Sequence, residues 1–186
     1  MKNRVAELEQ ELSELKKRLA EARRNAPRRE VKEYTFAARN GQTVSLSELF
    51  GDRDDLLVIH NMGRSCPYCT LWADGFIGLA HHIENRAAFA MVSPDSPETQ
   101  AEFAAGRGWK FRMVSDEEKA FTDDMGYLKD GTHFQPGVSA FHKDENGKIL
   151  RTGTTWFGPG DDFCSVWAFL DLLAEGANGW EPKYSY

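Results

Sequence analysis

The chain has 186 residues, of which 41% are hydrophobic, and a formal net charge of -6. This length is typical of one domain with an appendage, and the negative charge argues against a nucleic-acid partner for the main body. Three cysteines are too few for a disulfide scaffold. The sequence opens without an apolar leader and has no apolar run long enough to cross a membrane, so we expect a cytoplasmic protein without a membrane partner.

Residues 1–26 predict an amphipathic helix that stands apart from the main domain, which we place at 30–186. Its apolar residues recur at alternating steps of three and four, with charged residues between them: Val5, Leu8, Leu12, Leu15 and Leu19. Such a narrow seam typically pairs with another helix, and about three heptads are marginal for a helix alone. We therefore expect a homodimer through this helix; the alternative is a seam that lies on its own subunit.

A short basic segment follows the helix. Pro27 predicts the end of the helix, because proline disfavours helical backbone in the residue before it. The first 30 residues carry nine Lys or Arg and six Asp or Glu, a formal charge of +3, so the remainder carries -9. We interpret the arginines around the proline as a solvated linker: Arg23, Arg24, Arg28 and Arg29.

Beyond the linker the pattern changes to short strands alternating with helices. Apolar runs and turn residues predict strands at 34–36, 42–45, 56–60, 89–93, 111–114, 138–141 and 148–152. Helical spacing predicts helices at 66–85, 96–106 and 116–125, a capped turn at 45–50, and a last helix beginning at Asp161 or Asp162. This order is typical of an α/β protein with a mixed sheet and helices on both faces.

The segment Ser65-Cys66-Pro67-Tyr68-Cys69 joins a buried strand to a helix. At a helix N-terminus, free N–H groups and the positive dipole end favour a thiolate, so Cys66 should be exposed and have a low pKa. Cys69 lies one turn further along, where it can attack a mixed disulfide and close the pair. Pro67 suits the first helical turn, because its missing N–H would have no partner there.

Two other interpretations of the cysteine pair stay open. A zinc site usually takes four ligands, and Cys164 is the remaining cysteine, so a site of four cysteines within one chain is impossible. The pair could also be two inert cysteines of the core.

Several residues near the pair are candidates for a role. Arg64 could lower the pKa of Cys66, or it could be an ordinary loop charge. His60 could move a proton to Cys69, or it could be a buried histidine with satisfied hydrogen bonds. Tyr68 and Trp72 could wall a substrate groove, as could Trp109 and Trp156, and core packing is the alternative for Trp72.

The order of elements around Cys-x-x-Cys resembles the thioredoxin fold. The resemblance implies a cis-proline that faces the cysteine pair just before the strand that leads into the hairpin, and Pro136 stands at that place. Residues 41–46, 92–98 and 114–126 look like the peroxiredoxin branch of the fold, and the Cys-Pro-Tyr-Cys tetrapeptide is that of glutaredoxins. The resemblance therefore implies a thioredoxin-like three-layer sandwich of the peroxiredoxin-like branch.

The C-terminal part resembles a bacterial domain-of-unknown-function family, number eight-nine-nine. The similar stretches are 151–153, 156–163 and 179–184. This resemblance covers about residues 30–186 and leaves the N-terminal helix out; it implies a fold and a cysteine site without an established substrate. One departure from peroxiredoxins is Gly63, which stands three residues before Cys66 where those enzymes place a threonine or serine.

The leading hypothesis is a thiol–disulfide oxidoreductase. Cys66 attacks a disulfide of a protein or a small molecule, Cys69 resolves the mixed disulfide, and an unidentified cellular reductant resets the pair, with no cofactor. The first alternative is a module that binds Cu(I) or zinc through Cys66 and Cys69, with or without His133, since some copper-handling thioredoxin-like proteins use a histidine from the corresponding loop. The second is a non-catalytic assembly protein that works through its N-terminal helix.

Overall fold

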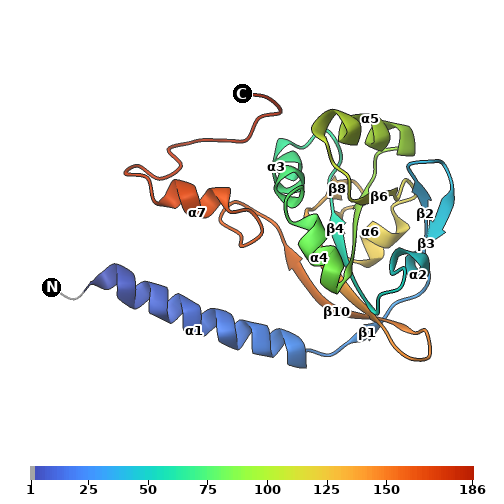
Figure 1. Cartoon of the computed structure of the whole chain (residues 1–186), viewed down its shortest axis with the longest axis horizontal. Coiled ribbons are helices and arrows are strands. Elements are labelled where there is room, and N and C mark those ends of the chain that lie inside the picture. The colour runs from blue at the N-terminus through green and yellow to red at the C-terminus, as the bar shows by residue number, and fades with distance from the viewer. Residues whose placement is uncertain (1–2) are drawn as a thin grey trace.

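A mixed eight-stranded sheet forms the centre of the computed structural model, which describes residues 3–186 (Figure 1). Its strands are β1 Arg29–Glu30, β2 Thr35–Ala38, β3 Thr43–Ser45, β4 Asp55–His60, β5 Ala88–Ser93, β6 Arg112–Ser115, β9 Gly137–Lys143 and β10 Ile149–Trp156. Their spatial order is β1-β10-β9-β4-β5-β6-β2-β3, with β4, β5 and β6 parallel and the other pairs antiparallel. β7 Leu128–Lys129 and β8 His133–Phe134 form a separate small hairpin.

Helices cover both faces of this sheet. The helices that do so are α2 Leu46–Leu49, α3 Pro67–Phe76, α4 Ala80–Arg86, α5 Pro97–Arg107, α6 Ala120–Asp124 and α7 Val166–Asp171, whereas α1 Arg4–Asn25 stands apart. Buried side chains of α2 and α6 pack on one face, and those of α3, α4, α5 and α7 pack on the other. The predicted three-layer α/β sandwich is confirmed.

The two faces of the sheet enclose separate hydrophobic cores, because successive side chains of a strand point to opposite sides. Along β4, Val58 packs with Phe121 of α6, whereas its neighbour Ile59 packs with Trp72 of α3. The same alternation along β5 and β9 extends both cores across the sheet. A residue's position along the strand therefore decides which core it joins.

Two predicted helices differ from those in the structure. The segment predicted as one helix at 66–85 is divided at residues 77–79, between α3 and α4, near two glycines that weaken helical backbone. The last helix begins at Val166 rather than after Asp161. The Asp161 carboxylate instead accepts hydrogen bonds from three backbone N–H groups that form a turn ahead of the helix: Gly158, Phe163 and Cys164.

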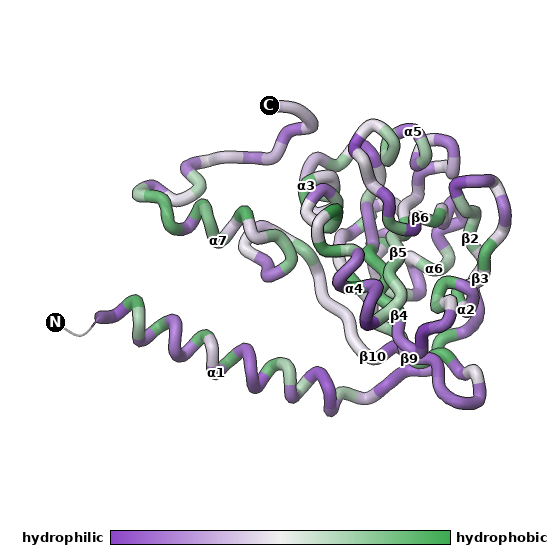
Figure 2. The backbone as a smooth tube through the Cα atoms, in the orientation of Figure 1, coloured by the Kyte–Doolittle hydropathy of each residue, from purple (hydrophilic) through white to green (hydrophobic). Residues whose placement is uncertain are grey.

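The N-terminal helix α1 extends away from the sheet (Figure 1), and none of its side chains is buried. Apolar positions recur along its length in Figure 2, and the side chains of the predicted seam are 44–64% exposed. An ion pair of 2.6 Å between Lys16 Nζ and Asp162 Oδ1 links the helix to the loop before α7. Across residues 3–186, no helix is long and apolar enough to cross a membrane.

The predicted cis bond at Gln135–Pro136 is wrong, since no peptide bond within residues 3–186 is cis. Backbone hydrogen bonds hold both residues: the Gln135 N–H donates to the Tyr127 carbonyl at 2.8 Å, and the Pro136 carbonyl accepts from the Phe157 N–H at 3.0 Å. The chain enters β9 through these pairings with a trans bond. The proline therefore gives no support to a redox function, and that hypothesis rests on the cysteine geometry.

Candidate thiol site

Cys66 lies at the N-cap of α3, directly after the loop that follows β4. Its Sγ accepts a hydrogen bond from the Cys69 N–H at 3.1 Å, which satisfies one of the free donors at the helix N-terminus. Pro67 occupies the first turn, as the sequence predicts. The Cys66 side chain is half-buried and Cys69 is 3% exposed, so an incoming molecule meets Cys66 first.

The loop before Cys66 has a fixed shape. The Gly63 N–H donates to Asn61 Oδ1 at 2.7 Å, and the Arg64 N–H donates to Asp95 Oδ2 at 2.7 Å. Gly63 has φ +100°, and a Cβ there would lie 3.1 Å from Asp95 Oδ1. A side chain at this position would be strained and crowded, which accounts for the glycine where peroxiredoxins place a hydroxyl residue.

The pKa values of the two thiols are shifted in opposite directions. A hydrogen bond from the Cys69 thiol, followed by the backbone N–H groups of Cys69 and Tyr68, lowers the pKa of Cys66 to about 7 against the effect of burial. The interaction with Cys66 and burial both raise the pKa of Cys69. The charge of Arg64 is not among the causes for either cysteine, and its side chain is exposed. Of the two thiols, Cys66 is therefore the more acidic.

His60 lies on the opposite face of the sheet from the cysteines. Its ring stacks on Tyr127, with centroids 3.7 Å apart, and on Phe121 at 5.5 Å, while Nε2 shares a hydrogen bond of 3.0 Å with Ser139 Oγ. Burial, and then the charge of Arg151, lower the pKa of His60 well below its ordinary value. The predicted proton transfer from His60 to Cys69 is therefore wrong, because the two side chains belong to different cores.

Tyr68 and Trp72 connect α3 to the C-terminal part of the chain. The Tyr68 ring lies 6.2 Å from Trp72 and 6.3 Å from Trp167 of α7, and Trp72 lies 5.4 Å from Phe157. Trp72 is 3% exposed, so it belongs to the core rather than to a substrate groove. Tyr68 is half-buried and lies between the two cysteines in sequence, which makes it the aromatic side chain nearest to the pair along the chain.

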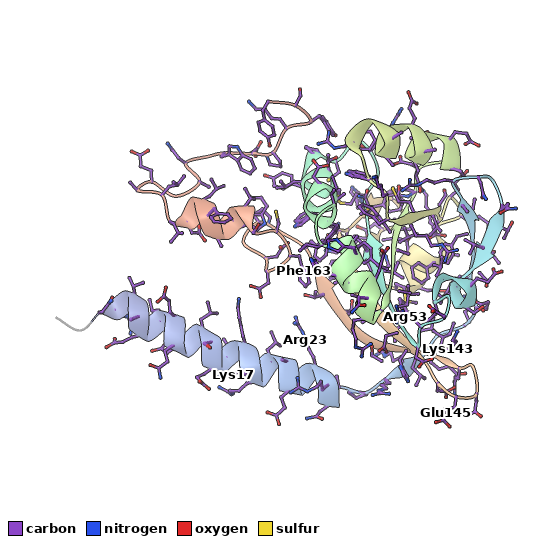
Figure 3. All side chains as sticks on the ribbon, in the orientation of Figure 1. Lys17, Arg23, Arg53, Lys143, Glu145 and Phe163 are labelled. Atoms are coloured by element: carbon purple, nitrogen blue, oxygen red, sulfur yellow. The ribbon has the colours of Figure 1, made fainter. Side chains whose placement is uncertain are left out.

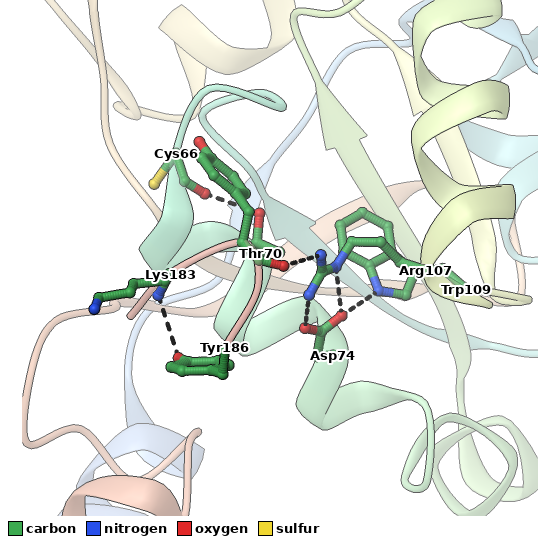
Figure 4. Close-up of polar contacts among 8 residues, drawn as sticks. Cys66, Thr70, Asp74, Arg107, Trp109, Lys183 and Tyr186 are labelled. Carbon is green, nitrogen blue, oxygen red and sulfur yellow. Dashed lines mark hydrogen bonds and ion pairs between the residues drawn. The ribbon is translucent and has the colours of Figure 1, made fainter. Parts of the chain in front are cut away.

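The C-terminal tail passes beside the cysteine pair, a feature that the sequence reasoning missed. Arg107 Nη1 donates to the Tyr184 carbonyl at 3.0 Å, and the same guanidinium pairs with Asp74 of α3 (Figure 4). The Tyr184 ring also meets Phe103 of α5 edge-on at 6.4 Å. Burial raises the pKa of Tyr184, and the charges of Cys66 and Cys69 raise it further, so its phenol lies within electrostatic range of the pair.

The other aromatic candidates do not line the cysteine site. Trp109 is 4% exposed and donates from Nε1 to Asp74 at 2.8 Å, so it stabilises the packing of α3 against α5. Trp156 lies at the end of β10 and packs against Tyr127 and Lys129.

The described residues do not form the metal site that the sequence left open at Cys66, Cys69 and His133. His133 is an exposed residue of β8, where its Nδ1 shares a hydrogen bond of 3.1 Å with Thr132 Oγ1. No group of three or more His, Cys, Asp or Glu side chains within residues 3–186 is placed to hold a metal ion. His133 therefore does not join Cys66 and Cys69.

The third cysteine, Cys164, is buried, and burial raises the pKa of its thiol.

Comparison with solved structures gives the fold of the domain. Peroxidoxin BcpB from Mycobacterium tuberculosis is 23% identical, with a TM-score of 0.56 over 69% of this chain and 84% of that protein. Peroxiredoxin Q from Xanthomonas campestris is 20% identical, with a TM-score of 0.54 over 66% and 80%. A peroxiredoxin-like protein from Aquifex aeolicus is 17% identical, with a TM-score of 0.55 over 68% and 73%. The chain thus has the thioredoxin-like fold of these proteins.

Comparison of sequences gives the family. No curated protein matches the chain. The family described as "Bacterial protein of unknown function (DUF899)" matches over residues 2–185. This match includes the N-terminal helix, so the expectation that the resemblance begins near residue 30 is wrong. The chain belongs to the DUF899 family.

Proposed function

We propose that the chain is a thiol–disulfide oxidoreductase in which Cys66 is the nucleophile and Cys69 the resolving thiol. The observation that carries this proposal is the position of Cys66 Sγ at the N-cap of α3, where it accepts the Cys69 N–H at 3.1 Å. The low pKa of Cys66 provides the thiolate near pH 7. Burial keeps Cys69 away from other reactants before it attacks the mixed disulfide.

The reaction has two displacement steps. The Cys66 thiolate attacks one sulfur of a substrate disulfide, which forms a mixed disulfide and releases the other substrate sulfur as a thiolate. Cys69 then loses its proton and attacks Cys66 Sγ, which releases the second substrate thiolate and leaves a Cys66–Cys69 disulfide. Two electrons have passed to the substrate. A cellular dithiol in the cytoplasm reduces the pair again.

Insulin reduction with dithiothreitol as the electron source tests this proposal. The unmodified chain should accelerate precipitation of the insulin B chain, whereas Cys66→Ser should reduce the rate to the uncatalysed level. Cys69→Ser should keep the first step and accumulate a mixed disulfide that mass spectrometry can identify. Cys164→Ser is the matched control and should retain the rate. Full activity of Cys66→Ser would contradict the proposal.

We also propose that the N-terminal unit of residues 1–26 joins two copies of the chain. The apolar seam of α1 stays exposed among residues 3–186, and a short helix of this kind is marginal without a partner surface. Residues 1 and 2 lie outside the described part of the helix. Pairing of two such seams would leave the thioredoxin-like domain of residues 30–186 free on either side.

Light scattering after size-exclusion chromatography tests this assembly. Leu12→Lys and Leu15→Lys each place a charge in the seam and should convert the dimer to a monomer. Gln10→Lys adds the same charge on the other side of the helix and should leave the dimer unchanged. A monomeric unmodified chain, or leucine variants that remain dimeric, would exclude α1 as the contact.

A further inference from the structure

A basic pocket lies between the end of α1 and the bulged part of β10. Its volume is about 270 Å³, and its lining residues are Arg23, Ala26, Pro27, Arg29 and the stretch 151–154 of β10. Figure 3 shows Arg23 on the last part of α1, near the edge of the sheet. The register of β10 against β9 shifts between Arg151 and Gly153, and this bulge forms one side of the pocket.

Three of the lining residues are arginines without a counter-charge. Within residues 3–186, neither Arg23 nor Arg29 nor Arg151 forms an ion pair. Arg151 donates from Nη2 to Thr154 Oγ1 at 2.6 Å, and its buried Nε has no hydrogen-bond partner. A buried donor of a charged group without a partner is unfavourable, so the Arg151 guanidinium is incompletely satisfied.

The strand register increases this cost. Arg29 of β1 stands directly opposite Arg151 of β10 in an antiparallel pair. Like charges in that position repel each other. Burial is the main cause of the lowered pKa of Arg151; Tyr127 opposes it, and the charge of Arg29 adds a smaller lowering effect. An anion bound beside these two arginines would offset the repulsion.

We propose that this pocket binds a small molecule that carries a phosphate or diphosphate group. Guanidinium groups match phosphate oxygens in pairs of parallel hydrogen bonds, and three positive charges favour a dianion over a single carboxylate. The volume suits a compact ligand, since it lies just below the usual range for drug-sized molecules.

The pocket is independent of the proposed thiol chemistry. Arg151 pairs with Phe141 of β9, and Phe141 pairs with Leu56 at the start of β4. Cys66 follows the opposite end of β4. The two sites therefore lie toward opposite ends of the central strands, and the failure of one proposal would leave the other intact.

Isothermal titration of the full chain with pyrophosphate and with inorganic phosphate, at constant ionic strength, tests the site. We expect binding of at least one of these, and at least about tenfold weaker binding to Arg23→Gln and Arg29→Gln, since a charged hydrogen bond contributes about 1.5–3 kcal/mol. Arg24→Gln removes the same charge next to the pocket and should change the affinity less than about twofold.

The outcomes separate a built site from a diffuse basic surface. An equal loss in Arg24→Gln, or the same affinity for acetate as for phosphate, would mean non-specific attraction and overturn the proposal. Absence of heat with both phosphate and pyrophosphate would overturn it as well. Arg151→Gln should abolish binding, and should it fail to fold, the two exposed arginines still decide the question.

Discussion

The two faces of the sheet differ in the kind of polar group that they hold. On one face, Cys66 and Cys69 lie at the end of a helix, where one sulfur is half-buried and accepts a backbone N–H. On the other face, His60 is fully enclosed by two aromatic rings and a serine hydroxyl. The cysteine face leaves a thiol of lowered pKa partly accessible, whereas the histidine face buries a titratable group and keeps it neutral.

Distance along the sequence is therefore a poor guide to which residues make up the site. His60 is six residues before Cys66, yet strand alternation directs its side chain into the other core. Tyr184 is more than a hundred residues away, yet the charges of both cysteines act on its phenol.

The largest expected effect is the difference in reactivity between the two cysteines. Alkylation of Cys66 by iodoacetamide should rise with pH around a midpoint of about 7, because half of its thiol is ionised there. In Cys66→Ser, Cys69 should react at least about a hundredfold more slowly at pH 7, since burial still raises its pKa. Mass spectrometry of the reduced protein over pH 5 to 9 measures both rates. A Cys66 midpoint near that of a free thiol would contradict the proposed nucleophile.

Much of the fold could be predicted from the sequence because its signals are local. The apolar run of β4, the Ser45–Glu48 capping box and the start of α3 at Pro67 all appear where the residue pattern indicates. A helix start depends on a few neighbouring residues, and a strand pattern depends on alternate ones, so both can be read without knowledge of the tertiary structure.

The parts that could not be predicted depend on contacts between distant segments. Gln135 and Pro136 form backbone hydrogen bonds with Tyr127 and Phe157, which lie outside the local sequence. The residues next to the proline therefore could not predict these bonds. The site of Tyr184 depends on Arg107, which is anchored by Asp74 on another helix. The pocket of arginines combines α1, β1 and β10, and the basic linker alone gave no sign of a concave site.

His60→Ala should lower the free energy of unfolding without changing the thiol chemistry. Removal of a buried ring leaves a cavity between Tyr127 and Phe121, and such substitutions cost about 2–5 kcal/mol. Urea denaturation measures the loss, and the pH midpoint of Cys66 alkylation should remain at about 7. A shift of that midpoint would show that the two faces are coupled, contrary to the geometry.

Gly63→Ala should also destabilise the fold, and less than the loss of His60. The left-handed backbone costs about 1–2 kcal/mol for a residue with a Cβ, and that Cβ would press on Asp95. Gly75→Ala is the matched control, because Gly75 lies within α3 with open space around it and should gain about 0.5–1 kcal/mol. Thermal unfolding of both variants gives the comparison. Equal behaviour of the two alanines would mean that the loop before Cys66 tolerates a side chain.

The smallest effect is expected at the C-terminal tail. Tyr184→Ala removes the phenol beside the cysteines and its contact with Phe103, while the backbone anchor at Arg107 stays in place. Cys66 should then become more exposed, and its alkylation rate at pH 7 should rise about two- to fivefold, as opening free energies of exposed segments are small. Tyr186→Ala is the control, since Tyr186 lies two residues further along and is 85% exposed. An unchanged rate in Tyr184→Ala would mean that the tail passes near the cysteines without covering them, so access to Cys66 would be set by α3 and its preceding loop alone.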